Sequence, residues 1–277
     1  MVMEKYLTQE QMAFAERTLE QILKKMPAVV QRCANILPYT TDENGRYDNR
    51  ADEKRFPDWG LGRSWWTNGF WGGIMWQLFH ATGDDIYKAA AERSEEMLDP
   101  CFDQFYGLHH DVGFMWQPTA VMNYRLTGNL RSRARGLHAA TLLAGRYNPA
   151  GRFIRAWNEV SDADTRGWAI IDCMMNISLL YWASEESGDP RYAEVAAAHA
   201  DTVLHSFIRE DGSSCHIIEF DPVRGGMIRS YGGQGFAEGS AWTRGQAWAI
   251  YGFMISYLHT GHDAYLETSR KVADYFV

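Results

Sequence analysis

Asp172 is a carboxylate placed inside an otherwise apolar stretch of the chain, which runs from Trp168 to Asn176. A buried carboxylate is costly unless it is paired, hydrogen-bonded or used in chemistry. Burial also raises the pKa of the group and favours its protonated form, which is the form that acid catalysis requires. The alternative is a structural aspartate bonded to a nearby arginine or indole N–H. The apolar setting favours a proton donor.

A second aspartate, Asp111, follows His109 and His110 and precedes an apolar stretch from Val112 to Trp116. This position suits the N-cap of a helix as well as a second catalytic carboxylate, and the residues alone favour neither. Side chains of adjacent residues diverge on a helix or a strand, so the two histidines are not expected to share one metal ion. We therefore predict no metal site.

A glycine-rich segment from Tyr231 to Gln246 carries donors suited to an anionic ligand. Glycines let the backbone approach a ligand closely, and Arg244 and Gln234 can both bind a carboxylate. The alternative for Arg244 is an arginine that caps a helix end. His216 lies in the preceding connector and fits an exposed loop histidine equally well.

The same turn signal occurs four times, and each time it separates an apolar stretch from an amphipathic one. Glycine suits the left-handed position after a helix, and Asp or Asn then caps the next helix. Each signal therefore predicts a tight turn between antiparallel helices. The four turns are Thr82–Asp84, Thr127–Asn129, Ser187–Asp189 and Thr260–Asp263.

The helices before and after these turns differ in character. Those after the turns have one apolar face, whereas Phe70–Phe79, Trp168–Trp182 and Trp242–Tyr257 are apolar nearly all round. Alternation of buried and amphipathic helices predicts an inner ring wrapped by an outer ring, which is an all-α (α/α)6 barrel. An opening helix, capped by Thr8 and Gln11, and four hairpins give about nine helices, whereas six hairpins need twelve. We predict a single domain over residues 1–277 that lacks its last hairpins.

Three long connectors, Thr41–Gly62, Asn148–Asp164 and Arg209–Gly239, are rich in glycine and polar residues. Loops of this length in a helical domain are uncommon unless they are functional. We expect all three to gather at one end of the barrel, at the entrance to its bore.

The composition limits the kinds of partner. A net charge of −8 argues against nucleic acid and anionic membranes as partners. The 4 cysteines have no metal-ligand spacing, the amino terminus lacks a signal sequence, and no stretch is long enough to span a membrane. These features predict a cytoplasmic protein. Aromatic residues make up 14% of the chain, and some of its 11 tryptophans are candidates for stacking on a sugar ring.

Several motifs together resemble the signatures of the unsaturated glucuronyl hydrolases, glycoside hydrolase family 88. The matching segments are His110–Phe114, Trp168–Asn176 with Asp172 at its centre, Trp242–Trp248 and Phe56–Trp71. The similarity covers essentially the whole chain. It implies removal of a 4,5-unsaturated glucuronic acid from lyase-generated glycosaminoglycan oligosaccharides, without a cofactor, by hydration of the C4=C5 enol ether.

The resemblance also implies roles for individual residues. Asp172 matches the proton donor, and Asp111 matches the second essential aspartate. The residues expected around the uronate are His110, Trp65, Trp157, His216, Gln234, Arg244 and Trp242, with Trp65 and Trp157 as stacking faces. Ser240 stands where a bulkier aromatic is expected in some members, so the next sugar, its sulfation and the oligomeric state stay open.

Three alternatives accompany this hypothesis. Unsaturated rhamnogalacturonyl hydrolases share the barrel and the paired aspartates. An ordinary inverting glycosidase would use two carboxylates roughly 6.5–9.5 Å apart. An open helical fragment that binds sugar without turnover is the third, and the burial of Asp172 argues against it.

Overall fold

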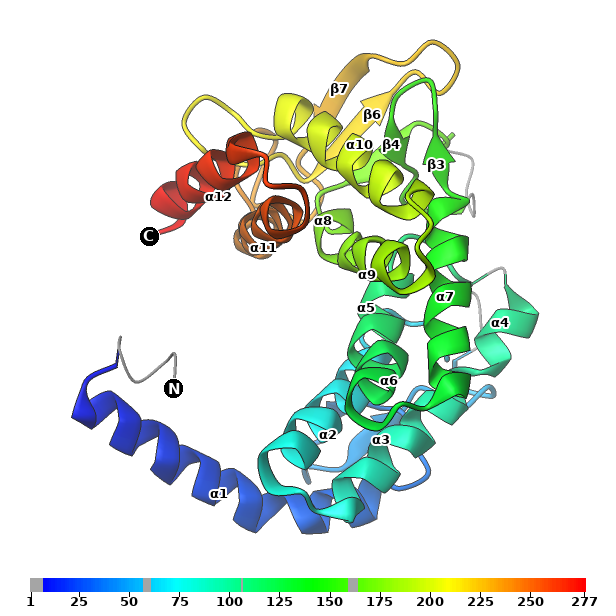
Figure 1. Ribbon diagram of the computed structural model, residues 1–277, viewed down its shortest axis with the longest axis vertical. Coiled ribbons are helices and arrows are strands. Elements are labelled where there is room, and N and C mark those ends of the chain that lie inside the picture. The colour runs from blue at the N-terminus through cyan, green and yellow to red at the C-terminus, as the bar shows by residue number, and fades with distance from the viewer. Residues whose placement is uncertain (1–6, 57–60, 106, 159–163) are drawn as a thin grey trace.

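The chain folds into an open arc of antiparallel helical hairpins (Figure 1). The computed structural model describes residues 7–56, 61–105, 107–158 and 164–277, so parts of two predicted connectors and of the Phe56–Trp71 motif lie outside the described residues. The arc opens with α1 (Gln9–Cys33), whose first turn is closed by the predicted capping box between Thr8 and Gln11.

Four helical hairpins follow α1 along the described part of the chain. They pair α2 (Asn68–Thr82) with α3 (Asp85–Leu98), α6 (Met122–Thr127) with α7 (Leu130–Ala144), α9 (Ser178–Ser187) with α10 (Arg191–Ser206), and α11 (Thr243–Thr260) with α12 (Asp263–Phe276). The first helix of each pair ends at a glycine with φ between 69° and 74°, the left-handed conformation that the turn signal predicts.

The residues that start the second helices agree with the prediction in part. The side chains of Asp84 and Asn129 accept hydrogen bonds from the backbone of α3 and α7 and so cap these helices, as predicted. In the last hairpin the N-cap is His262, which makes no side-chain capping bond, and Asp263 is already helical. The predicted aspartate cap is wrong there, because the turn is one residue longer.

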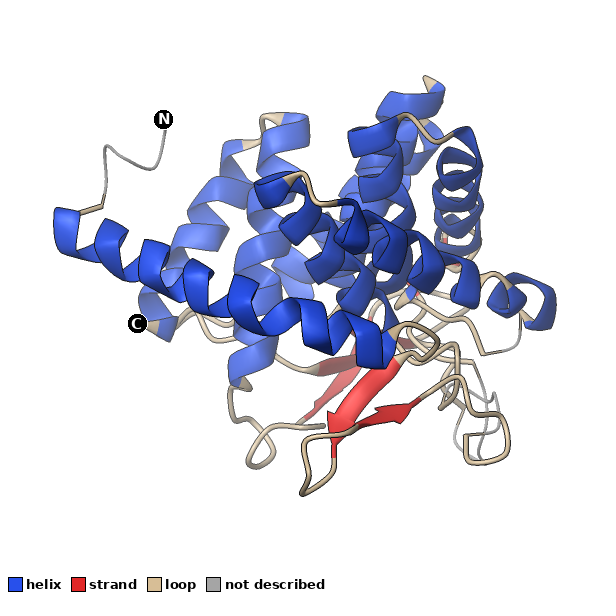
Figure 2. Ribbon diagram, turned by 90° about the horizontal axis from the view of Figure 1, so that it is seen from below, coloured by secondary structure: helices blue, strands red, loops and turns tan. Residues whose placement is uncertain are grey.

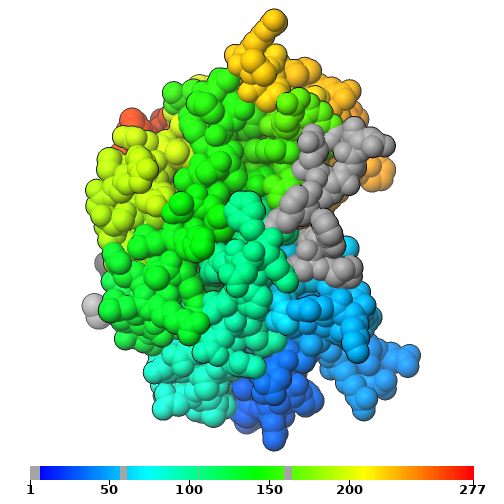
Figure 3. Space-filling view, turned by 90° about the vertical axis from the view of Figure 1, so that its right-hand side faces the viewer, coloured from blue at the N-terminus to red at the C-terminus, as the bar shows by residue number. Residues whose placement is uncertain are grey.

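The inner side of the arc depends on glycines that allow close helix packing. A Cβ on Gly69 of α2 would overlap the backbone of α5 (Val112–Trp116), and one on Gly252 of α11 would overlap Met174 of α8 (Cys173–Asn176). Gly113 of α5 lies equally close to Asn176. The inner helices α2, α5, α8 and α11 are therefore neighbours in this order. Figure 1 shows α3, α7 and α10 on the convex side, and Figure 3 views that side, with α7 between α3 and α10.

The second inner segment is interrupted before and after α5. The short helix α4 (Pro100–Gln104) precedes it, and a π-helical turn, η2 (Gln117–Val121), joins it to α6. Pro118 has no N–H to donate, which explains the widened turn at this point.

The long connectors contain short strands that the sequence analysis did not predict. The strands are β1 (Pro38–Thr41), β2 (Tyr47–Asn49), β3 (Tyr147–Asn148), β4 (Phe153–Ile154), β5 (Trp168–Ile170), β6 (Ile217–Phe220) and β7 (Met227–Tyr231). They lie together on one side of the helices (Figure 2), as expected for the connectors. The predicted helix Trp168–Trp182 is wrong at its start, because Trp168–Ile170 pairs with β6 before α8 and α9 begin.

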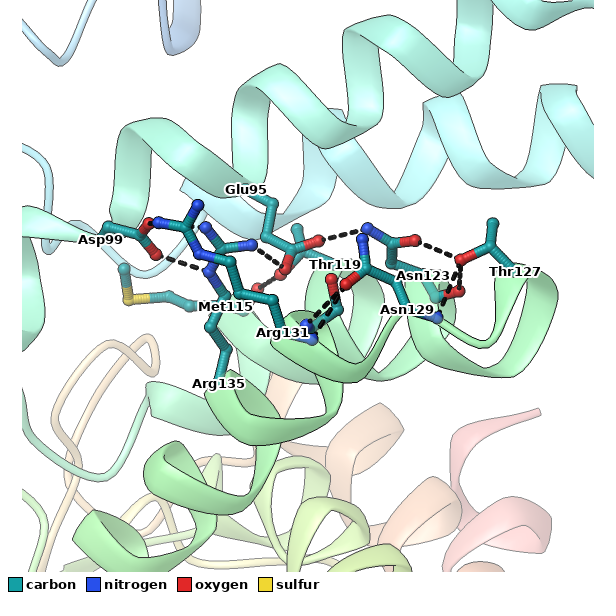
Figure 4. Close-up of polar contacts among 10 residues, drawn as sticks. Glu95, Asp99, Met115, Thr119, Asn123, Thr127, Asn129, Arg131 and Arg135 are labelled. Atoms are coloured by element: carbon teal, nitrogen blue, oxygen red, sulfur yellow. Dashed lines mark hydrogen bonds and ion pairs between the residues drawn. The ribbon is translucent and has the colours of Figure 1, made fainter.

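A buried ionic network joins α3 to α7 on the convex side. Arg135 of α7 bonds to Glu95, whose side chain is fully buried, and to Asp99 at the end of α3 (Figure 4). Asn123 of α6 donates a second hydrogen bond to Glu95 at 2.9 Å. The network fixes two successive hairpins relative to each other, because both charges of its central pair are out of water.

The arc therefore matches the predicted all-α barrel architecture. Grouping α5, η2 and α6 as one segment gives, among the described residues, the opening helix and four hairpins that the sequence predicts. Figure 1 shows a gap between α1 and α12, the two ends of the arc. Within the described ranges, no helix is long and apolar enough to cross a membrane.

Candidate active site

Most of the predicted site residues line one cavity of about 200 Å³ beside the strands. Its walls come from the segment before α2, the turn before α5, the junction of β5 and α8, and the connector before α11. The lining residues are Trp65, Trp66, His109, His110, Asp111, Trp157, Ile170, Asp172, His216, Gln234 and Arg244. The cavity brings eight of the nine predicted residues together, although they are up to 179 positions apart (244 − 65 = 179).

Asp111 occupies the N-cap position of α5 but makes no capping hydrogen bond with its side chain. Its carboxylate faces His110 Nε2 at 3.2 Å and Asn176 Nδ2 at 3.4 Å. Burial raises the pKa of Asp111 well above its usual value, and the neighbouring charge of Asp172 raises it further. Asp111 therefore lies at the N-cap position, but its side chain does not cap the helix and lines the cavity instead.

Asp172 lies at the junction between β5 and α8, where it holds the N-cap position of α8. The prediction that it sits inside a helix is wrong, but the predicted burial is correct, since its side chain is 13% exposed. Burial raises the pKa of Asp172 to about 6, against a smaller opposing effect of Arg244. Its Oδ2 has no hydrogen-bond partner among the described residues, and His216 Nε2 is 3.8 Å away.

Asn176 connects the two aspartates, and the sequence analysis assigned it no role. Its Nδ2 donates to the backbone oxygen of Asp172 at 3.1 Å and points to Asp111 Oδ1, while its Oδ1 accepts from Phe114 N at 2.7 Å. The side chain is completely buried. Asn176 thus links the carboxyl group of Asp111 to the backbone of Asp172. Its place four residues after Asp172 is the only sequence signal for this role.

His216, Gln234 and Arg244 form a connected row along another wall. His216 Nδ1 accepts from the Gln234 backbone N–H at 2.9 Å, so the neutral ring carries its proton on Nε2, toward Asp172. Burial and the charge of Arg244 lower the pKa of His216 to about 4, so the ring is neutral at physiological pH. Arg244 donates to Gln234 Oε1 at 2.8 Å.

Trp242 is the predicted site residue that does not line the cavity. It holds the N-cap position of α11, where its ring packs on His216 with the centroids 4.4 Å apart. The guanidinium of Arg244 lies over the same indole, 4.2 Å from its centroid. Trp242 therefore supports two wall residues, and its contact with the ligand itself stays a prediction.

A partly buried arginine, Arg146, holds the wall that carries Trp157, and the sequence analysis missed it. Arg146 donates to the backbone oxygens of Arg155 and Ala156 and to the side chain of Asn158. Asn158 in turn donates to Leu108 O, just before the histidine pair. The charge of Arg146 also lowers the pKa of Asp111, which is one of several effects on that group.

The histidine pair departs from the expectation that adjacent side chains diverge. Residues 109–111 form a turn, and ligand atoms of His109, His110 and Asp111 all lie within 4.8 Å of one another. Burial lowers the pKa of His109 to about 3. The geometric reason given against a metal is therefore wrong for this turn. The absence of a metal stays a prediction.

The chain matches no protein-family model. It does match unsaturated glucuronyl hydrolase from Bacillus sp. (strain GL1), with 40% identity over 213 residues that cover 76% of this chain and 56% of that protein. A solved UGL structure with dGlcA-Glc-Rha-Glc superposes with a TM-score of 0.82 and 34% identity, covering 93% of this chain and 67% of that one. The chain belongs to the unsaturated glucuronyl hydrolase family.

Further relatives fall in the same family. Unsaturated chondroitin disaccharide hydrolase from Streptococcus pyogenes serotype M1 is 37% identical over 76% of this chain and 53% of its own length. The crystal structure of the glucuronyl hydrolase from Bacillus sp. GL1 superposes with a TM-score of 0.81 and 35% identity, covering 89% of this chain and 63% of that chain. This chain spans about half the length of the curated relatives it matches. The family and the barrel predicted from the motifs are confirmed.

Proposed function

We propose that this protein removes 4,5-unsaturated glucuronic acid from the non-reducing end of glycosaminoglycan oligosaccharides that a polysaccharide lyase has cut. The observation that carries the proposal is the carboxyl group of Asp172. It has a raised pKa and an oxygen without a hydrogen-bond partner among the described residues, and it faces a cavity of about 200 Å³. Such a group can hold a proton near neutral pH and deliver it to a bound ring.

In the proposed reaction, Asp172 protonates C4 of the enol ether, and positive charge develops at C5 and the ring oxygen. Water adds to C5 and gives its proton back to the Asp172 carboxylate, which restores the acid. The resulting hemiketal opens, and the hemiacetal left at C1 expels the remaining sugar. The reaction consumes one water and no external acid, base or cofactor.

The surrounding groups suit the other demands of this reaction. Asp111, held by His110 and Asn176, is placed to bind ring hydroxyls and to stabilise the developing charge. Among the described residues that line the cavity, Arg244 is the only lysine or arginine, and it can bind the uronate carboxylate. Trp65 and Trp157 supply flat faces for the sugar ring.

An ordinary inverting glycosidase on the same barrel is the main rival. It would cleave saturated and unsaturated uronides by displacement at C1, whereas hydration requires the double bond. The test is incubation with lyase-generated unsaturated chondroitin disaccharide, followed by the loss of ultraviolet absorbance of the double bond. Cleavage of the saturated disaccharide at a comparable rate would contradict the hydration mechanism. Comparing the rates on this disaccharide and on an unsaturated rhamnogalacturonan disaccharide tests the alternative of an unsaturated rhamnogalacturonyl hydrolase.

Two further predictions belong to this proposal. A cytoplasmic location is consistent with four cysteines that are all free and buried, because such thiols persist under reducing conditions. A single catalytic domain over the whole chain is consistent with the unbroken succession of hairpins along the arc. Cell fractionation checks the first, and one cooperative melting transition checks the second.

A further inference from the structure

A second cavity, of about 430 Å³, adjoins the candidate active site across a short sheet. Strands β5, β6 and β7 pair so that Trp168 lies opposite Glu219, and Ile170 opposite Ile217, which in turn pairs with Tyr231. These side chains share one face of the sheet. Ile170 lines the catalytic cavity, whereas Trp168, two residues earlier on the same strand, lines the second cavity.

A row of aromatic rings runs along this face from one cavity to the other. The ring of Trp157 in the catalytic wall lies 6.0 Å from that of Trp168, and Trp168 lies 4.8 Å from Tyr231. Arg229 donates a hydrogen bond to the Tyr231 hydroxyl at 2.7 Å, which fixes the orientation of that ring. The fully exposed ring of Phe236 also lines the second cavity. We call Trp168, Tyr231 and Phe236 the aromatic platform.

The loop that forms the far wall belongs to both cavities. Gln234 lines the catalytic cavity, and its neighbours Gly233 and Gly235 line the second one. Gly233 has a φ of 56° and lies so close to His216 that a Cβ would overlap the imidazole ring. A ligand that leaves the catalytic cavity past Gln234 therefore meets the platform next.

The charges around the platform indicate the kind of ligand. Among the described residues that line the second cavity, only Glu238 is charged. None of them is a lysine or an arginine. Arg229, nearby on β7, is paired with Glu219. A sulfate or carboxylate would meet a like charge here without a compensating cation, whereas a neutral sugar ring can stack on aromatic faces.

We propose that the second cavity is a subsite for neutral sugar residues of the leaving oligosaccharide, with the aromatic platform as its stacking surface. The inference rests on the proposed function, because it assumes that an unsaturated uronate occupies the first cavity. Its volume is about twice that of the catalytic cavity, which leaves room for more than one sugar ring. Among substrates with the same unsaturated glucuronate, the protein would then favour those whose leaving group carries several neutral sugars over those whose leaving group carries one.

The test compares two substrates that carry the same unsaturated glucuronate, one linked to a single glucose and one linked to three neutral sugars. The measured quantity is the ratio of kcat/KM for the longer to the shorter substrate. Phe236→Ala is expected to lower this ratio about 2- to 10-fold, the range expected for the loss of one aromatic contact. Phe236→Tyr should restore the ratio, and Leu130→Ala, at an exposed site on α7 outside both cavities, should not change it.

The outcomes separate this inference from the proposed function. Turnover of both substrates with an equal ratio in wild type and Phe236→Ala would overturn the subsite alone. The subsite would also be overturned if the ratio of kcat/KM for the longer to the shorter substrate were equally high when the outer sugars of the longer substrate are sulfated. Action on unsaturated chondroitin disaccharide but on neither test substrate would also overturn the subsite alone. Should wild type act on none of the three, the proposed function fails. Tryptophan fluorescence titration with a neutral tetrasaccharide then decides the subsite: weaker binding by Phe236→Ala supports it, and equal or undetectable binding overturns it.

Discussion

The carboxyl group of Asp172 combines burial with a place in the cavity lining, and a substitution can separate the shape of the side chain from its ability to transfer a proton. Asp172→Asn keeps the size of the side chain but has no proton to deliver to C4. We expect kcat to fall by about 10²- to 10⁴-fold, the range of general acid catalysis. The decay of ultraviolet absorbance measures the rate, and circular dichroism checks that the fold is retained. Activity near that of wild type would remove Asp172 from the mechanism.

The same substitution should also change how the unfolding free energy depends on pH. Because the pKa of Asp172 rises from 3.8 to about 6 on folding, the folded state holds the proton more tightly than the unfolded state. Its contribution is fully present below pH 3.8 and is lost as the pH rises through 6. Relative to Asp172→Asn, wild type should lose about 2 kcal/mol of unfolding free energy between pH 4 and pH 7. Parallel urea titrations of both proteins check this, and a constant difference would contradict it.

Arg244 lies over Trp242 and bonds to Gln234, so its charge is held at the cavity wall. Arg244→Ala should chiefly raise KM for an unsaturated uronide, since a charge-assisted bond to a carboxylate contributes about 1.5–3 kcal/mol. The loss should shrink when the substrate is the uncharged methyl ester. Wild type that processes the ester as well as the acid would show that Arg244 does not bind the carboxylate.

At the scale of the elements, the ionic network between α3 and α7 provides a matched pair of tests. Arg135→Met leaves the fully buried Glu95 without its cationic partner, and breaking a buried pair in this way costs about 3–5 kcal/mol. Arg131, which is largely exposed, pairs with the same Asp99, and Arg131→Met should cost about 1 kcal/mol or less. Denaturant unfolding of both variants measures the two costs. Equal costs would show that the buried pair does not stabilise the hairpin contact.

The hairpins could be predicted because their signals are local. A glycine and a capping residue within three positions fix each turn, and an apolar stripe fixes each amphipathic helix. The strand Trp168–Ile170 could not be predicted in this way, since its partner Ile217 lies far along the chain. An apolar run of this length is equally compatible with a buried helix and a buried strand.

The same distinction applies to the site. The type and setting of Asp172 and Asp111 made them candidates before their geometry was known. Asn176, in contrast, has a role only because it meets Asp111, 65 positions earlier. Arg146 likewise acts through backbone oxygens of a connector, and backbone acceptors carry no sequence signal. The candidate catalytic residues were therefore easier to predict than the residues that position them.

At the scale of the whole molecule, the open arc leaves large apolar side chains in water. Phe14 on α1 is 64% exposed and Leu258 on α11 is 67% exposed. Tyr251 lies two turns before Leu258 and therefore on the same face of α11, where it is 38% exposed. The expectation that closing hairpins are absent stays a prediction, but these exposed faces have a consequence of their own. Exposed apolar side chains of this size favour association in water.

We therefore expect the 277-residue chain to associate in a concentration-dependent way, with light scattering as the measurement. Leu258→Lys places a charge on the exposed face of α11 and should shift the protein toward monomer, because burying that charge in a contact is costly. Leu130→Lys changes a leucine that is 73% exposed on the outer helix α7, and it should leave association unchanged. A wild-type chain that is monomeric at every concentration would show that these faces are satisfied within the arc itself. An equal effect of both substitutions would instead point to net charge, since each adds one cation to an acidic chain.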